Sequence, residues 1–323
     1  MAVFTQVSEQ EVQAFIEPLQ IGHLQSLRGI GAGIENTNYF VSTDAGEWVL
    51  TLFERLSLQQ LPFYLRLMQH LAMRGLPVPR PCADARNEIL FTLKGKPAAL
   101  VNRLEGEHPW APDEQHCRQV GAMLARMHLV GQDFPMRQPN LRGLHWWEHT
   151  VPLVLPFLDE GRARLLSDEL AFQQQLSKSA AYRELPCGPV HADLFRDNVM
   201  FDGLPGHPKL TGIFDFYFAG VDTWLFDLAV CLNDWCIDQA TGTLEIDRAH
   251  AFVSAYGSVR NLSATEHRLL PALMRAAALR FWVSRLWDFH LPREASMLEP
   301  HDPTHFERVL RARVEQPWHA LQS

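Results

Sequence analysis

The chain has 323 residues, of which 47% are hydrophobic and 20% charged, a composition that excludes disorder and suffices for two globular lobes. Its formal net charge of -8 argues against a general nucleic-acid binder, because such proteins contact phosphates through many Lys and Arg side chains. Any phosphate-binding site must therefore be local.

The cysteines and the N-terminus indicate the compartment. Five cysteines form no C-x-x-C pair and, being odd in number, fit no simple disulfide framework, so we expect reduced thiols. Residues 1–15 lack the basic and apolar regions of a signal peptide. No later stretch approaches the roughly 18 apolar residues of a membrane span. We expect a cytoplasmic protein with neither membrane nor nucleic-acid partners, and the oligomeric state stays open.

The first hundred residues predict a small β-sheet with one helix. Strand-like runs separated by Gly, Asp and Asn residues indicate strands over 24–29, 38–42 and 48–53, with two further strands over 88–93 and 97–104. Between them, residues 58–74 carry apolar side chains at helical spacing, and the pattern ends at Gly75.

A glycine-rich turn separates the first two strands. Gly29, Gly31 and Gly33 would allow the backbone to approach a phosphate closely, because glycine tolerates positive φ and exposes its N–H groups. An ordinary hairpin turn explains the same glycines. Asn36 and Asn38 follow, and they suit either a phosphate or substrate contact or a turn.

Beyond a Gly- and Pro-rich passage at 106–112, the pattern becomes helical. We expect helices over 113–129, with Asp113 as N-cap, and over 158–182, 247–257 and 266–289, with short strands at 199–201 and 210–214. The sequence thus predicts an α+β fold with a small antiparallel β-sheet lobe, residues 1–104, and a larger, mainly α-helical lobe, residues 105–323.

The strongest chemical signal is the H-x-D-x-x-x-x-N motif at 191–198, followed after a predicted hairpin by Asp215. Phosphoryl transfer to an alcohol needs a group that accepts the hydroxyl proton, together with oxygen ligands for Mg²⁺. Asp193 suits the first task, and Asn198 and Asp215 suit the second. Turn capping by these polar residues is the alternative.

These residues resemble the catalytic loop and metal-binding Asp of the aminoglycoside-phosphotransferase and protein-kinase-like superfamily. The resemblance implies a bilobal kinase-like fold with ATP and Mg²⁺ as cofactors, a nucleotide-binding first lobe and a catalytic, substrate-binding second lobe. It implies Asp193 as catalytic base or hydroxyl orienter, Asn198 and Asp215 as metal ligands, and His191 as a packing residue. Residues 98–104 resemble the segment that links the lobes, where the backbone of Asn102, Arg103 and Leu104 would meet adenine.

A narrower resemblance, to bacterial homoserine kinases of this fold, is carried by residues 31–41 (GAGIENTNYFV) and 226–236 (FDLAVCLNDWC). It implies ATP-dependent phosphorylation of the side-chain hydroxyl of L-homoserine, an amino-acid alcohol. Asp234 and Trp235 would then suit the substrate ammonium group, and Arg285 its carboxylate. A surface Asp and a core Trp explain the first two residues equally, and an arginine at this helical spacing is more often solvated or paired with Asp288 or Glu294. Asp227 suits an N-cap or a tie to the catalytic loop.

The chain departs from the superfamily pattern in its third strand. Thr51 stands where the superfamily usually has a phosphate-binding lysine, and the helix over 58–74 contains no acidic partner for such a lysine. The joint loss indicates a changed phosphate-binding scheme, in which Arg55, Lys94, an arginine of the second lobe or a second Mg²⁺ would supply the positive charge. Two other functions stay open: a kinase for choline, ethanolamine or an aminoglycoside, and a nucleotide-binding pseudokinase.

Overall fold

The computed structural model describes residues 4–31, 36–204, 206–291 and 301–320. The chain forms two compact units. The first consists of Met1–Gly106 with Thr211–Phe214, and the second of Glu107–Leu210 with Asp215–Ser323. An α+β kinase-like architecture, as the sequence predicts, is present in these two units.

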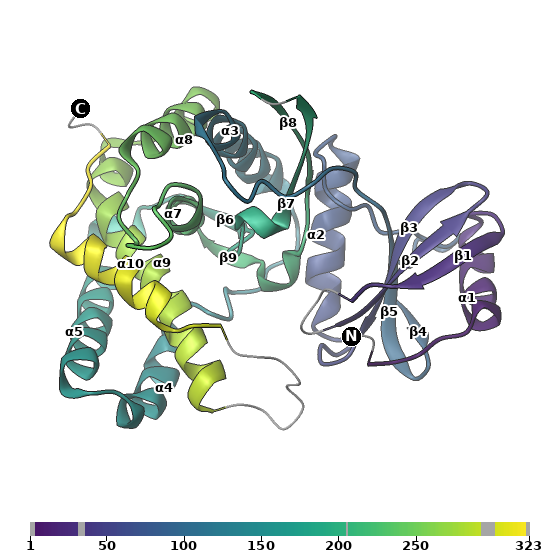
Figure 1. The fold of residues 1–323 in the computed structure, drawn as a ribbon, viewed down its shortest axis with the longest axis horizontal. Helices are drawn as coiled ribbons and strands as arrows, with labels where there is room; N and C mark the ends of the chain where they lie inside the picture. Colours follow the sequence, from purple (N-terminus) through teal and green to yellow (C-terminus); the bar gives the residue numbers. More distant parts are fainter. Residues whose placement is uncertain (1–3, 32–35, 205, 292–300, 321–323) are drawn as a thin grey trace. The chain divides into compact units, whose positions relative to one another are not determined.

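The first unit is built on a five-stranded sheet with the order β1-β2-β3-β5-β4 (Figure 1). Its strands pair antiparallel, so neighbours in the chain fold back on one another. Alternate residues of β2 are buried, which is the pattern of a strand with one face on the core. The strands are β1 (Leu24–Gly29), β2 (Asn36–Thr43), β3 (Gly46–Phe53), β4 (Phe91–Leu93) and β5 (Lys96–Asn102).

Two helices accompany this sheet, α1 (Glu9–Ile16) and α2 (Leu61–Met73). The sequence predicted only the second. Helix α1 begins with a capping box in which the Ser8 side chain and the backbone N–H of Glu11 bond, and the Glu11 carboxylate bonds the Ser8 backbone in return. Its apolar side packs on the sheet through a core cluster that includes Val12, Ile16, Val41 and Leu50.

The second unit is mainly helical and contains two small two-stranded sheets, β6-β9 and β7-β8, the last strand of which ends in the first unit. Asp113 caps α3 through bonds to two backbone N–H groups, as predicted. The elements are α3 (Glu114–Val130), α4 (Leu144–Val154), α5 (Glu160–Ser177), α6 (Ala180–Arg183), β6 (Cys187–Val190), β7 (Val199–Leu204), β8 (His207–Ile213), β9 (Gly220–Thr223), α7 (Trp224–Trp235), α8 (Ile246–Val259), α9 (Ala264–His290) and α10 (Thr304–Glu315).

Helix α7 lies at the centre of the second unit. All of its 12 residues are buried, including polar Asp227, Asn233 and Asp234. Figure 1 views this helix nearly end-on, with α3, α8, α9 and α10 around it. A helix that is buried on every side has to satisfy its polar groups within the protein, so each polar residue of α7 marks a specific contact.

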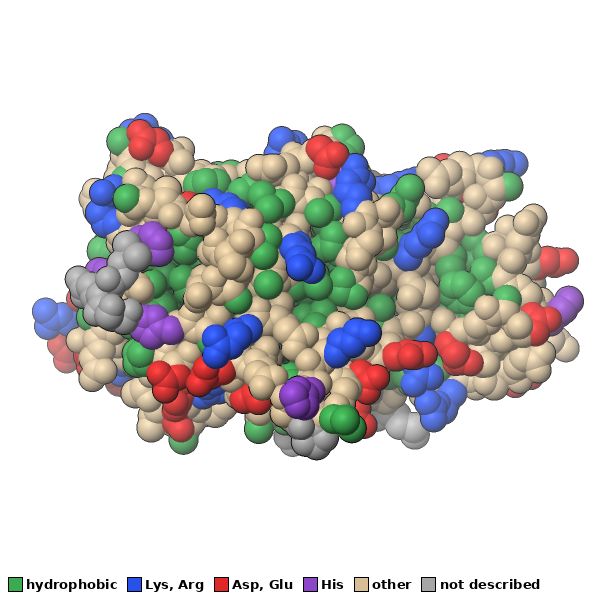
Figure 2. Space-filling model, turned by 90° about the horizontal axis from the view of Figure 1, so that it is seen from above, with side chains coloured by type: hydrophobic (Ala, Val, Ile, Leu, Met, Phe, Trp, Pro, Cys, Tyr) green, Lys and Arg blue, Asp and Glu red, His purple; other side chains and the backbone are tan. Residues whose placement is uncertain are grey.

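The surface drawn in Figure 2 carries charges of both signs. Figure 2 shows Lys and Arg side chains interspersed with acidic and apolar ones on the face it presents, without one broad basic area. All five cysteines are free thiols. Within the ranges that the structure describes, no helix combines the length and apolar character needed to cross a bilayer.

Candidate active site

The H-x-D-x-x-x-x-N motif occupies the loop between β6 and β7 in the second unit and ends in a 3₁₀ turn, Arg196–Asn198. We refer to residues 191–198 as the catalytic loop. The predicted hairpin follows as β7 and β8, and Asp215 comes directly after it, in the second unit again. Between the motif and Asp215, the chain therefore passes from the second unit into the first, at Thr211–Phe214, and returns to the second.

Two residues of this region adopt left-handed backbone conformations. Ala192 has φ of 63° and Asp215 has φ of 64°. Such values are uncommon for residues other than glycine and persist only where surrounding contacts impose them. Strong local restraints must therefore hold both the catalytic loop and the turn at Asp215.

For the catalytic loop, the restraint is Asp227 of α7, whose side chain is 0% exposed. Its Oδ1 accepts a hydrogen bond from the backbone N–H of Ala192 at 2.7 Å, and its Oδ2 accepts one from that of His191 at 2.8 Å. Burial alone would raise the pKa of this carboxyl, but the hydrogen bonds from the His128 side chain and the His191 backbone lower it, so Asp227 stays ionised. Of the two sequence interpretations, the loop tie is correct, since Thr223 rather than Asp227 caps α7.

His128 of α3 completes the ring of donors around Asp227. Its Nε2 lies 3.1 Å from Asp227 Oδ2, and its Nδ1 lies 2.7 Å from the Tyr256 hydroxyl. Because an ionised carboxylate can only accept, Nε2 carries the proton and Nδ1 accepts from Tyr256. Burial lowers the pKa of His128 and keeps the imidazole neutral, and its ring stacks on Trp224 with centroids 5.4 Å apart.

Asn198 is joined to the loop that carries Asp193. Its side-chain Nδ2 donates to the backbone carbonyl of Asp193 at 2.8 Å, so the two residues share one rigid turn. The His191 ring is 1% exposed and packs against Phe216, next to Asp215, with centroids 4.5 Å apart. These contacts link the loop to the segment that carries the second Asp.

The predicted metal ligands suit Mg²⁺ by chemical type. Asp215 offers carboxylate oxygens and Asn198 an amide oxygen, which are hard ligands. Within the described part of the chain, no cluster of three His, Cys, Asp or Glu residues is arranged as a complete protein cage. Magnesium in phosphoryl-transfer sites takes only one or two protein ligands and completes its shell with phosphates and water, so Asn198 and Asp215 fit that role.

The electrostatics of Asp193 differ from those of Asp227. Burial raises its pKa well above the usual range, and the carboxylates of Asp215, Asp197 and Asp234 raise it further. Arg280 opposes this, with its Nη1 3.8 Å from Asp193 Oδ1. A carboxyl whose pKa is raised by burial and by neighbouring acidic groups is a common feature of active sites.

The structure corrects the pairing predicted for Asp234 and Trp235. Asp234 Oδ2 accepts from the backbone N–H and the Nε of Arg196 at 2.8 and 3.2 Å. Trp235 is 0% exposed, and its indole N–H donates to the carbonyl of Leu194 at 2.9 Å. The Trp235 ring therefore supports the catalytic loop from inside the core and offers no face to a substrate ammonium group.

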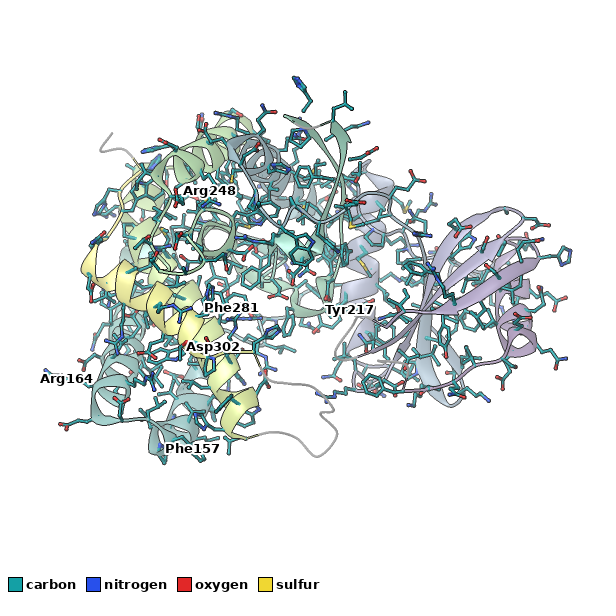
Figure 3. The ribbon with its side chains drawn as sticks, in the orientation of Figure 1. Phe157, Arg164, Tyr217, Arg248, Phe281 and Asp302 are labelled. Carbon is teal, nitrogen blue, oxygen red and sulfur yellow. The ribbon has the colours of Figure 1, made fainter. Side chains whose placement is uncertain are left out.

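Arg285, the predicted carboxylate ligand, lies on α9 with part of its side chain accessible. Its Nη1 donates to the backbone carbonyl of Asp302 at 3.3 Å, and its guanidinium covers the Phe306 ring at 4.5 Å. Burial lowers its pKa, while the charges of Asp234, Asp302 and Asp193 raise it, so it lies in the electrostatic field of these three carboxylates. Figure 3 labels Asp302 beside α10, and Phe281 of α9 above it.

In the first unit, the structure describes all of the residues predicted to bind nucleotide except Gly33. Gly31 is exposed, and a Cβ added there would meet no atom within 4 Å. Asn36 begins β2 opposite Phe53, whereas Gly33 lies outside the described residues. The backbone N–H groups of Asn102 and Arg103 already donate to the carbonyls of Arg80 and Glu47. Because these two N–H groups already form hydrogen bonds, the predicted adenine contact would use the backbone N–H of Leu104 and the backbone carbonyls of this segment.

The position of the missing lysine is occupied by a neutral pair. Thr51 donates to Asn38 Oδ1 across β2 and β3 at 2.7 Å. Lys94, one suggested replacement, is paired with Glu11 at 2.5 Å.

An ion pair that sequence reasoning missed lies on the same sheet, between Lys96 of β5 and Glu54, just after β3. Burial opposes ionisation of Glu54, yet hydrogen bonds from Lys96, Thr37 and Thr5 lower its pKa. The residue spacing gave no signal for this pair, because the two strands meet only through the sheet register.

The chain is similar to known phosphotransferases over most of its length. The model of the phosphotransferase enzyme family matches residues 26–262. The chain is similar to a homoserine kinase of Polaromonas naphthalenivorans (strain CJ2), with 61% identity over 98% of this chain and 99% of that protein. It is also similar to a homoserine kinase of Cupriavidus pinatubonensis (strain JMP 134 / LMG 1197), with 57% identity over 97% of this chain and 96% of that protein.

Among solved structures, the fold is similar to that of amicoumacin kinase hAmiN in complex with AMP-PNP, Ca²⁺ and Ami. The TM-score is 0.70 at 16% identity, over 96% of this chain and 95% of that one. An identity this low supports the fold alone. Together with the family match, it identifies the architecture as that of kinase-like phosphotransferases.

Proposed function

This chain belongs to the phosphotransferase enzyme family, and from that premise we propose that it transfers the γ-phosphoryl group of ATP to the side-chain hydroxyl of L-homoserine, forming O-phospho-L-homoserine. The observation that carries the proposal is its full-length likeness to homoserine kinases. The intact set of Asp193, Asn198 and Asp215 accords with an active kinase rather than a pseudokinase.

We assign the reacting hydroxyl to Asp193. Its carboxylate accepts a hydrogen bond from the hydroxyl, orients the oxygen for attack and takes up the proton as transfer proceeds. Its raised pKa favours this uptake, because a base that is too weak cannot accept a proton at neutral pH. Asp227 contributes by fixing the backbone on which Asp193 is carried.

ATP and Mg²⁺ are the proposed cofactors. Asn198 and Asp215 would hold the ion, which when bound neutralises charge on the phosphates. The first unit would receive the nucleotide, with the backbone of Gly31 and Gly33 and the Asn36 side chain near the phosphates. Lys96 and Glu54 supply a lysine–glutamate pair on that unit's sheet, although on strand positions other than those of the superfamily pattern.

The test is direct. Purified protein with Mg²⁺-ATP and L-homoserine should yield phosphohomoserine, followed by ³¹P NMR. Asp193→Asn should retain nucleotide binding in a calorimetric titration but lose turnover by about 10³-fold or more, because the amide cannot accept the proton. Turnover of choline, ethanolamine or an aminoglycoside with none of homoserine would overturn the substrate. No turnover of any acceptor by wild-type protein would favour a pseudokinase.

A further inference from the structure

Arg280 is a buried cation whose hydrogen bonds are incomplete. It lies on α9 and is 3% exposed. Its Nε and Nη2 are both buried and have no hydrogen-bond partner among the residues that the structure describes. Its Nη1 is 3.8 Å from Asp193 Oδ1, which is an ion pair but too long for a hydrogen bond. Buried polar groups almost always form hydrogen bonds, so two donors without acceptors on one charged group require an explanation.

The surroundings of Arg280 hold its guanidinium in place without using those donors. The Phe281 and Phe218 rings contact it at 3.7 and 4.8 Å from their centroids, and both contacts are cation–π in type. Burial lowers the pKa of Arg280 to about 10 and Asp193 opposes that shift, so the group stays charged at neutral pH. A fixed positive charge thus lies beside the proposed catalytic carboxylate.

Arg275 on the same helix behaves differently. Its Nε and Nη2 both bond to Glu169 Oε2, at 2.9 and 2.5 Å. These are the same two atoms that lack partners in Arg280. The helix therefore presents one arginine with its side-on donor pair occupied by a carboxylate, and a second with that donor pair empty.

The empty donor pair indicates the ligand. Nε and Nη2 form one edge of the guanidinium, with two parallel N–H groups that match the two oxygens of a carboxylate. We propose that Arg280 is the specificity-determining residue of this site and binds the α-carboxylate of the amino-acid substrate through that edge. The proposal rests on the proposed function. Homoserine carries its hydroxyl and its carboxylate at opposite ends of a three-carbon segment, so a substrate with its hydroxyl on Asp193 reaches the neighbouring guanidinium.

An aromatic cluster would line the space between the two ends. Phe195 of the catalytic loop lies 4.4 Å from Phe281 and 5.8 Å from Phe306, centroid to centroid. Phe195 is partly exposed and can offer an apolar surface to the substrate methylene groups, whereas Phe281 and Phe306 are buried and hold its ring in place. An apolar surface excludes water, which strengthens a charged hydrogen bond. The carboxylate would thus bind in an enclosed setting, where an arginine discriminates strongly against neutral analogues.

Two other roles for Arg280 make different predictions. If it only moderates the charge of Asp193, or binds the transferred phosphate, its loss lowers turnover equally for every acceptor. If it binds the carboxylate, its loss lowers turnover of homoserine far more than that of 3-aminopropan-1-ol, the same molecule without the carboxylate. The ratio of kcat/KM for these two acceptors therefore separates the roles.

The experiment measures that ratio in wild type, Arg280→Met, Arg280→Lys and the control Arg268→Gln, which removes an exposed arginine from the same helix. Wild type should favour homoserine by on the order of 10²- to 10³-fold, and Arg280→Met should reduce the preference to near unity with an unchanged KM for ATP. Arg280→Lys keeps the charge but loses the fork, so it should fall in between. Arg268→Gln should match wild type.

An unchanged preference in both Arg280 variants, or an equal loss for both acceptors, would overturn the inference. If Arg280→Met fails to fold, Arg280→Lys decides the question by the same ratio. Failure of the proposed function itself is seen separately, as wild-type protein that makes no phosphohomoserine.

Discussion

Two buried charged residues contact the catalytic loop, Asp227 from α7 and Arg280 from α9, and they differ in how completely they are hydrogen-bonded. Asp227 receives two backbone N–H groups and the His128 imidazole. Arg280 keeps two donors without partners in the described structure. A buried charge with complete hydrogen bonds stabilises a conformation, whereas one with incomplete bonds reduces stability unless a ligand supplies them. Asp227 therefore holds the loop in place, whereas Arg280 is the residue that we infer to bind the substrate carboxylate.

The largest stability effect is expected from Asp227→Asn. The amide turns a donor toward one of the loop N–H groups and removes the charge that His128 bonds to, so the free energy of unfolding should fall by about 3 kcal/mol. Urea denaturation measures this change. Activity should fall as well, because Ala192 loses the bond that supports its left-handed backbone. If the variant is as stable as wild type, Asp227 does not stabilise the loop as we infer.

Arg280→Met should behave in the opposite sense. Removing a guanidinium with two unbonded donors should leave the free energy of unfolding within about 1 kcal/mol of wild type, or raise it, because a flexible apolar side chain can fill the space. Loss of Arg280 removes a charge that lowers the pKa of Asp193, so the carboxyl can take up a proton instead of staying as an unpaired buried charge. A loss as large as that of Asp227→Asn, in the same urea titration, would show that Arg280 is structural.

The pH dependence of stability tests the His128 contact. The pKa of His128 is lowered in the folded protein, so on acidification the unfolded chain takes up a proton first, and stability is lost as pH falls below about 6.5. The expected slope is up to about 1.4 kcal/mol per pH unit. The pKa of Asp227 is also lowered, but its contribution is lost only in stronger acid, as pH falls through its folded value.

His128→Gln should flatten this slope in urea titrations between pH 8 and pH 5. His305, whose pKa burial and the nearby Arg285 and Arg308 lower to about 4, adds a slope of the same sign in both proteins. The difference between wild type and variant is therefore the informative quantity. Identical slopes would mean that His128 is not kept neutral by the fold.

The smallest effect is expected from Arg285→Gln. Its guanidinium already bonds the Asp302 carbonyl and covers Phe306, so it has less to offer a substrate than Arg280. We expect less than a tenfold rise in KM for homoserine, since only a partly exposed charge is removed. Steady-state kinetics measure it, and a rise that equals the effect of Arg280→Met would move the carboxylate site to Arg285.

The sequence predicted the fold well where the signal was local. Asp113 was recognisable as an N-cap because a capping residue lies next to its helix, and the strands of the first unit followed from short strand-like runs between turn residues. Helix α1 was missed although Ser8 and Glu11 have capping-box spacing, because eight residues give too few turns for a convincing apolar period.

The candidate site divides in the same manner. Asp193, Asn198 and Asp215 belong to a local motif, and their roles stay a prediction that the geometry accommodates. Asp234 and Trp235 were paired because they adjoin in the sequence, but successive residues on a helix point about 100° apart, so one bonds Arg196 and the other enters the core. Arg280 could not be distinguished from Arg275 and Arg285, since only the fold decides which arginine has partners.

The attachment of the catalytic loop has an evolutionary consequence. Asp227 holds the loop through backbone N–H groups, which every residue except proline possesses, so side chains of the loop can be replaced without releasing it. The helix that carries Arg280 is a separate element. If Arg280 binds the substrate carboxylate as we propose, changes in α9 can alter the acceptor while the catalytic loop keeps its attachment to α7.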